Sequence, residues 1–264
     1  PLTDHGFPEV PEALVISGPH FFLANPFMKS PRSVCTEKGH YDVLDLERLP
    51  DEYLPRTNYV PMSDGAEYSR RVPRVTWLEE GNERGAEVTK FYRLTFRGMI
   101  NAANERTLSG SIIPPGVAHI HTVQTTAFRS SSELVMAAGM AISILADFFI
   151  KSKGVAWLGS HWQALPKLTD TPSLQARTLS LHCLTAHYAQ LWEEVYDLEF
   201  AEQQWSQPAN PRLPQDFWSN LTGTWTRHCA LRSDYARRMA LVEIDVLVAQ
   251  ALGLTLDELL LIYR

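Results

Sequence analysis

The chain has 264 residues, of which 45% are hydrophobic and 20% are charged. This balance fits one large globular domain or two small ones and excludes a disordered chain. Its 24 Lys and Arg against 30 Asp and Glu give a formal charge of -6. That charge argues against a protein that coats nucleic acid non-specifically, because such binding needs a broad cationic surface, but it leaves room for a local basic face.

The cysteines indicate a reducing compartment. Cys35, Cys183 and Cys229 lie far apart and form no C-x-x-C pair, so neither a disulfide framework nor a zinc knuckle is expected and the cytoplasm is favoured. The chain starts at Pro1 without a signal-peptide pattern. We therefore expect it to be part of a longer polypeptide.

The first half of the chain carries strand-like alternation between turn signals. We expect strands within residues 13–23, 41–46, 72–78, 108–113 and 117–128, and either a strand or the start of a helix over 90–99. The turn sequence Pro114-Pro115-Gly116 predicts that the last two strands are joined as a pair. In the second of them, His119, His121 and Val123 are expected on one face.

From residue 130 the period becomes helical. We expect a buried apolar helix over 134–150 after a capping box at residues 130–133, a helix over 173–205, and a last long helix over 230–252. Ser143 and Asp147 interrupt the first of these, which favours a core helix over a membrane span. Residues 255–258 form a second capping box. The last long helix is expected to carry its apolar residues on one face, namely Leu231, Tyr235, Met239, Val242, Val246 and Ala249.

The predicted class is therefore α+β, with a β-rich region over 1–129 and a mainly helical region over 130–264 that together form either two units or one continuous domain. Catalytic motifs for phosphate loops, dinucleotides, nucleophile elbows and zinc proteases are missing from the sequence. A self-contained enzyme using His119, His121 or His161 is the least favoured interpretation, and no catalytic or metal-binding residue is assigned.

Positive charge is concentrated in one part of the chain. Residues 70–129 hold nine Lys and Arg against five acids, a surplus of +4, which leaves -10 for the rest. Arginines interleaved with aromatic and amide side chains are suited to phosphate and base-edge contacts, although arginines at alternate strand positions also fit an ordinary solvated face. The candidate DNA-binding residues are Arg70, Arg71, Arg74, Lys90, Tyr92, Arg93, Arg97, Asn104 and Arg106.

Several short sequence motifs resemble the C-terminal part of large adenine-N6 DNA methyltransferases of bacterial phage-defence systems. These motifs are DEYLPRTNYVP at 51–61, YRLTFR at 92–97, NERTL at 104–108, IIPPG at 112–116 and RRMALVEIDVLVA at 237–249, followed by GLT at 253–255 and DEL at 257–259. The nearest likeness is to the class I DISARM methylases, with BREX and Type IIG restriction–modification methylases as relatives. The likeness runs from about Ile16 to Arg264.

The resemblance implies a target-recognition region that grips double-stranded DNA. In that family a separate catalytic domain of the same polypeptide binds S-adenosylmethionine and holds the flipped adenine at an N-P-P-[YF] motif. This chain has neither the cofactor loop nor that motif, since Asn25-Pro26-Phe27 lacks the second proline. No cofactor is therefore expected in this chain.

Two questions stay open at this stage. Arg106 fits a structural role as well as a DNA-facing one, whereas for Arg93 and Arg97 a DNA-facing role is slightly favoured. The alternative function is a protein-interaction module that docks other subunits of a defence complex through its helices, without contacting DNA.

Overall fold

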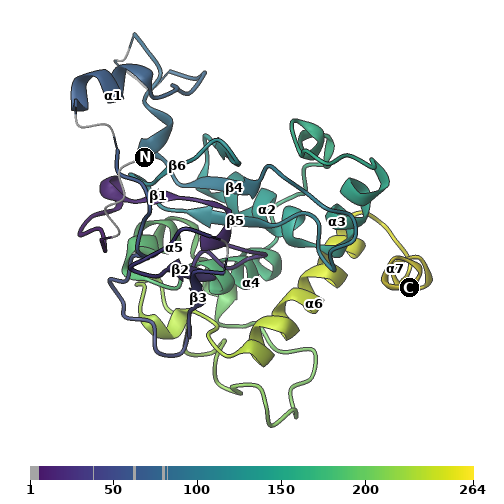
Figure 1. Ribbon diagram of the computed structural model, residues 1–264. Helices are drawn as coiled ribbons and strands as arrows, with labels where there is room; N and C mark the ends of the chain where they lie inside the picture. Colours follow the sequence, from purple (N-terminus) through teal and green to yellow (C-terminus); the bar gives the residue numbers. More distant parts are fainter. Residues whose placement is uncertain (1–5, 38, 62–63, 79–80, 82) are drawn as a thin grey trace.

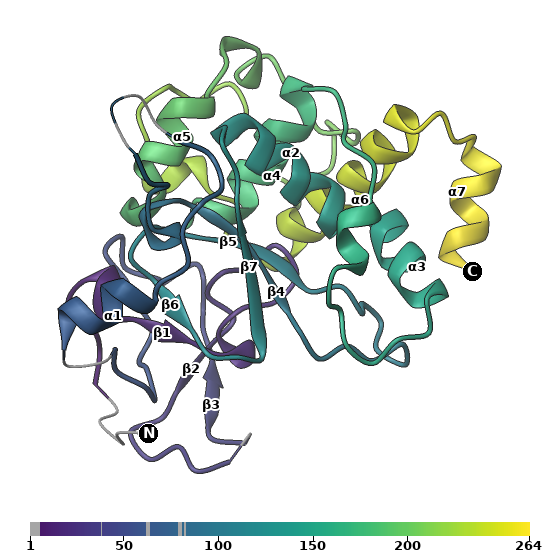
Figure 2. The same cartoon turned by 90° about the horizontal axis from the view of Figure 1, so that it is seen from above.

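The computed structural model describes residues 6–264 except 38, 62–63, 79–80 and 82. Short strands gather in one half of the molecule and most helices in the other (Figures 1 and 2), so the α+β class is confirmed. The strands are β1 Val15–Ile16, β2 Lys29–Pro31, β3 Tyr41–Val43, β4 Arg93–Arg97, β5 Gly110–Ile113, β6 Ala118–His119 and β7 Val123–Ala127. The helices are α1 Gly65–Arg71, α2 Ser131–Ile142, α3 Ile144–Ser152, α4 Pro172–His182, α5 Ala189–Val195, α6 Asp234–Ala251 and α7 Leu256–Tyr263.

The central sheet has the order β5-β4-β7 and is antiparallel throughout. Segment 90–99, which fitted either a strand or a helix, contains the middle strand β4. Phe96 lies opposite Gly110 on one side and Gln124 on the other. Because β4 is enclosed on both sides, four of its five residues are buried, the arginine Arg93 among them.

The predicted strand pair around the Pro-Pro-Gly turn is wrong. β5 and β7 lie on opposite sides of β4, and the expected strand over 117–128 is broken: β6 leaves the sheet to pair in parallel with β1, while β7 begins at Val123. The amide of Val123 donates to the carbonyl of Ile120, closing the turn that separates them. His119 and Val123 therefore do not share a strand face. The strand expected over 72–78 is also wrong, since that segment offers a single bridge, from Arg74 to Glu87.

The apolar helix over 134–150 is divided at Ser143. This residue ends α2 and also caps α3, where its hydroxyl accepts from the amide of Ala146 at 3.2 Å. A serine with extended backbone angles breaks the helix and satisfies the new N-terminus. No single helix in the described part of the chain is long and apolar enough to cross a membrane, and α2 and α3, which meet these criteria by length and composition only when taken together, are bent by 66°.

The helix expected over 173–205 is likewise broken. Its predicted apolar stripe is buried except at Leu198, which is 79% exposed, and consists of Leu181, Leu184, Tyr188, Leu191, Val195 and Leu198. α4 ends at His182, where Cys183 departs from helical angles, and α5 begins only at Ala189. Leu181, Leu184 and Leu191 are nevertheless fully buried. Spacing therefore identified most of the core residues although it misjudged the continuity of the helix.

The predicted apolar face of the last helix is buried only in part, at Leu231 and Ala249. Val242 and Val246 are 49% and 39% exposed, while the small or branched residues Ala236, Ala240, Ile244 and Val248 are buried. Three charged residues, Arg237, Glu243 and Asp245, are buried beside them. Apolar spacing fails here because this helix packs with paired charges on its inner face.

One hydrophobic cluster extends across the expected boundary at residue 129. It joins Phe96 and Leu108 of the β-rich region to buried residues of α2, α4 and α6. Arg237 strengthens the junction, since its guanidinium donates to the carbonyls of Ala24, Leu181 and Leu231 at 2.7, 3.0 and 2.7 Å. The two regions therefore share one core.

Acid should weaken this core through His182. Burial lowers the pKa of this imidazole to about 4, and the Nε2 atom has no hydrogen-bond partner. The unfolded chain takes up the proton near pH 6.5, so stability contributed above that pH is lost as the pH falls towards 4. We expect His182 alone to lower the free energy of unfolding by about 3 kcal/mol between pH 7 and 4.

Chemical denaturation at several pH values tests this expectation. The His182→Gln variant should show a shallower loss of stability towards acid than the parent, whereas His161→Gln, on the surface, should match the parent. An unchanged acid slope in His182→Gln would contradict the assignment.

Candidate functional site

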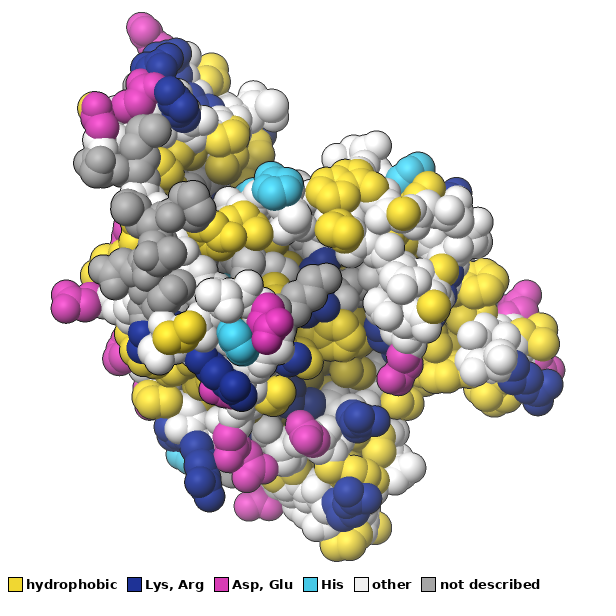
Figure 3. All heavy atoms as spheres, in the orientation of Figure 1, with side chains coloured by type: hydrophobic (Ala, Val, Ile, Leu, Met, Phe, Trp, Pro, Cys, Tyr) yellow, Lys and Arg dark blue, Asp and Glu magenta, His cyan; other side chains and the backbone are white. Residues whose placement is uncertain are grey.

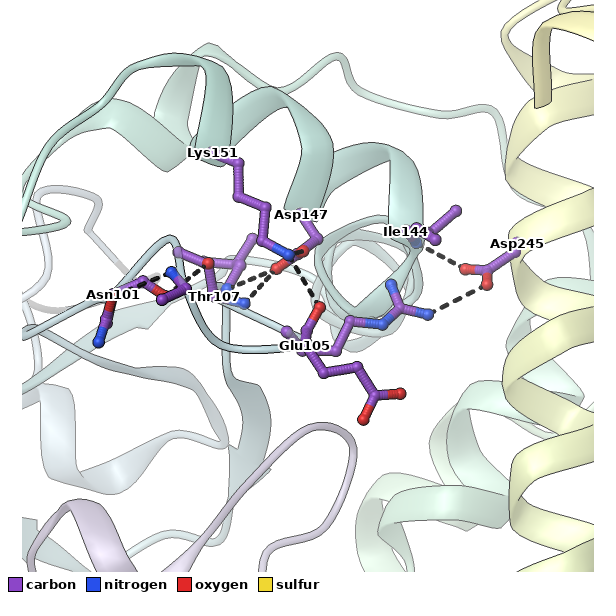
Figure 4. Close-up of polar contacts among 10 residues, drawn as sticks. Asn101, Glu105, Thr107, Ile144, Asp147, Lys151 and Asp245 are labelled. Carbon is purple, nitrogen blue, oxygen red and sulfur yellow. Dashed lines mark hydrogen bonds and ion pairs between the residues drawn. The ribbon is translucent and has the colours of Figure 1, made fainter. Parts of the chain in front are cut away.

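Residues 104–107, part of a motif that resembles the DNA methyltransferases, are held in place by buried carboxylates (Figure 4). The amides of Thr107 and Leu108 donate to Asp147 Oδ1 at 2.5 and 2.8 Å. Lys151 Nζ lies 3.1 Å from the other oxygen of Asp147 and donates to the carbonyl of Glu105 at 2.8 Å. Helix α3 therefore fixes the path of the loop that enters the central sheet.

Arg106 is also part of this anchorage. Its guanidinium lies 3.2 Å from Asp245 Oδ2 on α6, and only 1% of the Asp245 side chain is exposed. The same carboxylate accepts from the amide of Ile144 at 2.6 Å and from the Tyr263 hydroxyl at 2.5 Å. Burial raises the pKa of Asp245, while Arg106 opposes that rise. The structural role left open for Arg106 is the one that the structure supports.

Two further candidates are engaged inside the fold. Arg97 donates to the carbonyls of Gly18 and Phe21 at 2.9 and 2.5 Å, and burial lowers the pKa of its guanidinium. The Tyr92 hydroxyl donates to the carbonyl of His187 at 2.9 Å, and burial raises the pKa of that hydroxyl. The DNA-facing role favoured for Arg97 is therefore not supported, because its guanidinium satisfies carbonyls of the protein.

Other candidates lie at the surface. Arg70 and Arg71 both pair with Glu67 at 2.6 Å on α1, and their side chains are 72% and 63% exposed. Arg74, Lys90 and Asn104 are exposed as well, and Arg74 donates to the carbonyl of Gly85 at 3.0 Å. Asn104 belongs to the anchored loop and lies apart from the basic residues of α1. The nine candidates thus do not form one surface.

A cleft of about 660 Å³ brings two of the nine together. Arg71 and Arg93 line it, at the end of α1 and on β4 respectively. α1 stands clear of the rest of the molecule (Figure 1), and a recess lies beside it in the space-filling view (Figure 3). The lining residues come from the end of α1 and the two residues after it, from the short 3-10 helix η3 (Val88–Lys90), from β4, β6 and β7, and from the turn 159–163. They are Tyr68, Arg71, Val72, Pro73, Val88, Thr89, Arg93, Ala118, His119, Gln124, Thr125, Thr126, Gly159, Ser160, Trp162 and Gln163.

Arg93 has an unusual environment for a charged group. It is 1% exposed, it donates to the carbonyl of Val117, and its Nε atom has no partner. Burial lowers the pKa of its guanidinium to about 10. Gln124, on the edge strand β7, has a buried Oε1 atom that also lacks a partner. Buried polar atoms are costly unless they are hydrogen-bonded. The two side chains lie on opposite faces of the sheet, since Gln124 pairs with Phe96 and Arg93 pairs with Ala127.

Basic side chains line the cleft in the part of the chain that the structure describes, and acidic ones do not. None of the described residues that line it is an aspartate or a glutamate, whereas Arg71 and Arg93 are cations. His119 donates to or accepts from Thr125 Oγ1 at 3.1 Å, and burial, together with the nearby Arg93, lowers the pKa of this imidazole. A neutral histidine adds hydrogen bonding without charge. The cleft therefore suits a ligand with both negative charge and polar edges.

The histidines give no support to a metal or hydrolytic centre. Across the described residues, no group of three or more His, Cys, Asp and Glu side chains is placed to hold a metal ion. His119 lines the cleft, but His121 and His161 are exposed and do not line it. The three cysteines are free thiols.

Sequence reasoning missed most of the cleft. His119 is among the residues considered from the sequence, but Gln124 and Trp162 are not, because amide and aromatic side chains carry no periodic signal. It also missed the anchors Asp147 and Asp245, although a carboxylate within an apolar helix is itself a signal, because such a group is buried only when it is paired.

No family model, curated protein or solved structure matches this chain. The features that bear on its function are therefore the cleft and the motifs that resemble DNA methyltransferases.

Removal of Arg106 should destabilise the fold rather than a binding surface. We expect Arg106→Ala to lower the free energy of unfolding by about 3 kcal/mol, because it leaves Asp245 buried without its cation. Denaturation of Arg106→Ala, Asp245→Ala and the double variant measures the coupling. Additive effects of the two single variants would contradict a direct ion pair.

Proposed function

We propose that this chain is the DNA-recognition part of an adenine-N6 DNA methyltransferase in a bacterial antiviral or restriction–modification system. The observation that carries the proposal is the cleft that Arg71 and Arg93 line without a described carboxylate. The motifs that resemble recognition regions of these enzymes support the same proposal. One of them, at 92–97, contains the strand β4 that carries Arg93.

The basic residues of α1 are suited to the sugar–phosphate backbone. Arg70 and Arg71 share one carboxylate, Glu67, at the molecular surface. Exposed ion pairs of this kind contribute little to stability, so these guanidinium groups exchange Glu67 for phosphate oxygens at small cost. Arginine also presents paired donors that match a phosphate.

Methyl transfer belongs to the other part of the proposed protein. S-adenosylmethionine and the target adenine would be held by a catalytic domain of the same polypeptide, and this chain would orient the DNA towards it. A cytoplasmic location, where DNA and free thiols coexist, is part of the same proposal.

A second candidate function is supported by the opposite end of the molecule. Leu256 and Leu261 of α7 are 68% and 66% exposed, and Val242 of α6 is 49% exposed. Exposed apolar side chains mark protein interfaces when they gather. Docking of other defence-complex subunits through α6 and α7 is therefore the alternative, and its affinity would depend little on salt.

Arg71 and Arg70 provide a matched test of DNA binding through the cleft. They are adjacent on one helix and share Glu67, but only Arg71 lines the cleft. We expect Arg71→Gln to weaken binding of a mixed-sequence DNA duplex roughly tenfold and to reduce the magnitude of the salt slope by about one, because one charge-assisted phosphate contact is lost. Arg70→Gln should have a smaller effect.

Fluorescence anisotropy at two or more salt concentrations measures both quantities. Equal losses in the two variants would contradict binding through the cleft and indicate a diffuse charge effect. Absence of duplex binding by the parent chain at low salt would contradict the proposed function and favour protein docking.

A further inference from the structure

One edge of the central sheet is closed by the protein, and the other is open. Strand β5 is buried throughout, and its outward carbonyls are bonded. Gly110 accepts from the amide of Ala24 at 2.8 Å, and the carbonyl of Ile112 accepts from the hydroxyl of Tyr188 at 2.9 Å. Strand β7 forms the other edge. Four of its five residues are only partly buried, and Figure 2 shows no helix in front of it.

The register shows which main-chain groups β7 leaves open. Gly98 donates its amide to the carbonyl of Thr122 at 2.8 Å, and in an antiparallel ladder such bonded pairs recur at every second residue. The even-numbered residues of β7 therefore bond to β4, whereas the N–H and C=O groups of Thr125 and Ala127 point away from it. Among the residues that the structure describes, none bonds these four groups.

The open edge lacks the features that usually prevent an exposed strand from pairing. Natural edge strands are blocked by charged side chains, prolines or bulges. The sequence of β7 is Val-Gln-Thr-Thr-Ala, without a charge or a proline, and it pairs with β4 without a bulge. Valine and threonine also favour the extended conformation. Strand β7 therefore presents an edge that can accept another strand.

The cleft lies along this open edge and reaches both faces of the sheet. Residues 124–126 of β7 line it. On one face it meets His119, whose Nε2 atom lies 3.1 Å from Thr125 Oγ1. On the other face it meets Trp162, which packs on Phe96 with 5.0 Å between ring centroids. An extended chain beside β7 can reach both faces, because its side chains alternate between them.

The two sides of the cleft favour different side chains. Helix α1 lies on the same side of β7 as β6 (Figure 2), so Arg71 supplies an exposed cation on the side of His119. On the other side, a second cavity of about 200 Å³ shares Trp162 with the cleft. Most of its lining is apolar and includes the adaptable side chains of Met136 and Met140. An acidic side chain therefore suits the first side, and an apolar one suits the second.

We infer that β7 binds an extended segment of a partner protein as a further antiparallel strand, in which acidic and apolar side chains alternate. The main chain of the segment pairs with the open groups of Thr125 and Ala127. An acidic side chain of the segment meets Arg71, and its apolar neighbours lie against Trp162. Main-chain hydrogen bonds supply affinity in this mode of binding, and the alternate side chains supply selectivity. The occupant is a single segment rather than the edge of a second copy, because α1 and the turn 159–163 flank β7.

This docking of a protein segment does not depend on the proposed DNA function. Where that function holds, the segment and the DNA compete for Arg71, so an occupied edge lowers the affinity for duplex DNA. The partner protein then controls the access of DNA to the cleft.

The test compares three forms of one labelled peptide, Leu-Glu-Leu-Glu-Leu with blocked ends, by fluorescence anisotropy. The second form carries N-methyl groups on both glutamate amides, and the third carries them on the amides of the last two leucines. With the glutamates opposite Thr125 and Ala127, their amides face β7 and the leucine amides face away. We expect the glutamate-methylated form to bind roughly tenfold more weakly and the leucine-methylated form to bind as the unmodified peptide does. Leu-Lys-Leu-Lys-Leu, with the opposite charge, should also bind roughly tenfold more weakly.

Thr125→Pro blocks the open edge from the side of the protein. It removes an amide that points away from β4, so the ladder between β4 and β7 keeps its hydrogen bonds. This variant should bind the unmodified peptide roughly tenfold more weakly, whereas Thr125→Val, which keeps the amide, is the matched control and should bind it as the parent does. Circular dichroism verifies the fold of both variants. Ala127→Pro removes the other outward amide and takes the place of Thr125→Pro if that variant does not fold.

The outcomes separate this docking site from the DNA function. No binding of the unmodified peptide, equal binding of its three forms, or full binding by Thr125→Pro would overturn strand addition, whatever the duplex titrations show. A greater loss from leucine methylation would overturn the antiparallel pairing. Peptide binding by a chain that binds no duplex would uphold strand addition and contradict the DNA function. A bound peptide that leaves duplex affinity unchanged would overturn the competition for Arg71.

Discussion

The buried carboxylates of α3 and α6 are the constraint on which the rest of the structure depends. Asp147 accepts two consecutive main-chain amides at the entrance to β5, and Asp245 joins Arg106, the first turn of α3 and the C-terminal Tyr263. Each carboxylate is stabilised by several donors, which offsets the cost of its burial. Together they attach the central sheet to the helical region, so that both share one core.

This arrangement divides the arginines into two groups with different roles. Arg97 and Arg106 hold segments of the fold together through carbonyls and a carboxylate. Arg71 is exposed at the mouth of the cleft. Arg93 shares features of both groups, because its Nη2 atom donates to the carbonyl of Val117 whereas its Nε atom has no hydrogen-bond partner. The number of arginines in the sequence therefore overstates the cationic surface, and Arg71 is the exposed arginine among those that line the cleft.

Local patterns in the sequence predicted helix starts and buried stripes better than helix lengths. The capping box at Thr255 is present as expected, and Leu181 and Leu191 are buried as their spacing predicted. The breaks at Ser143 and Cys183 were missed, because they arise where side-chain capping and tertiary packing outweigh apolar periodicity. The cleft was not predictable, since its residues are brought together by the separation of β6 from β7 and by the path of the turn after α3, neither of which has a local signature.

Hydrogen exchange of the chain, with and without duplex DNA at low salt, tests the central claim most directly. The account predicts slower exchange on DNA binding in the segments that line the cleft, 68–73, 118–126 and 159–163, with little change in α6 and α7. Protection confined to α6 and α7, or spread evenly over the basic residues, would contradict the assignment of the cleft as the DNA-binding site.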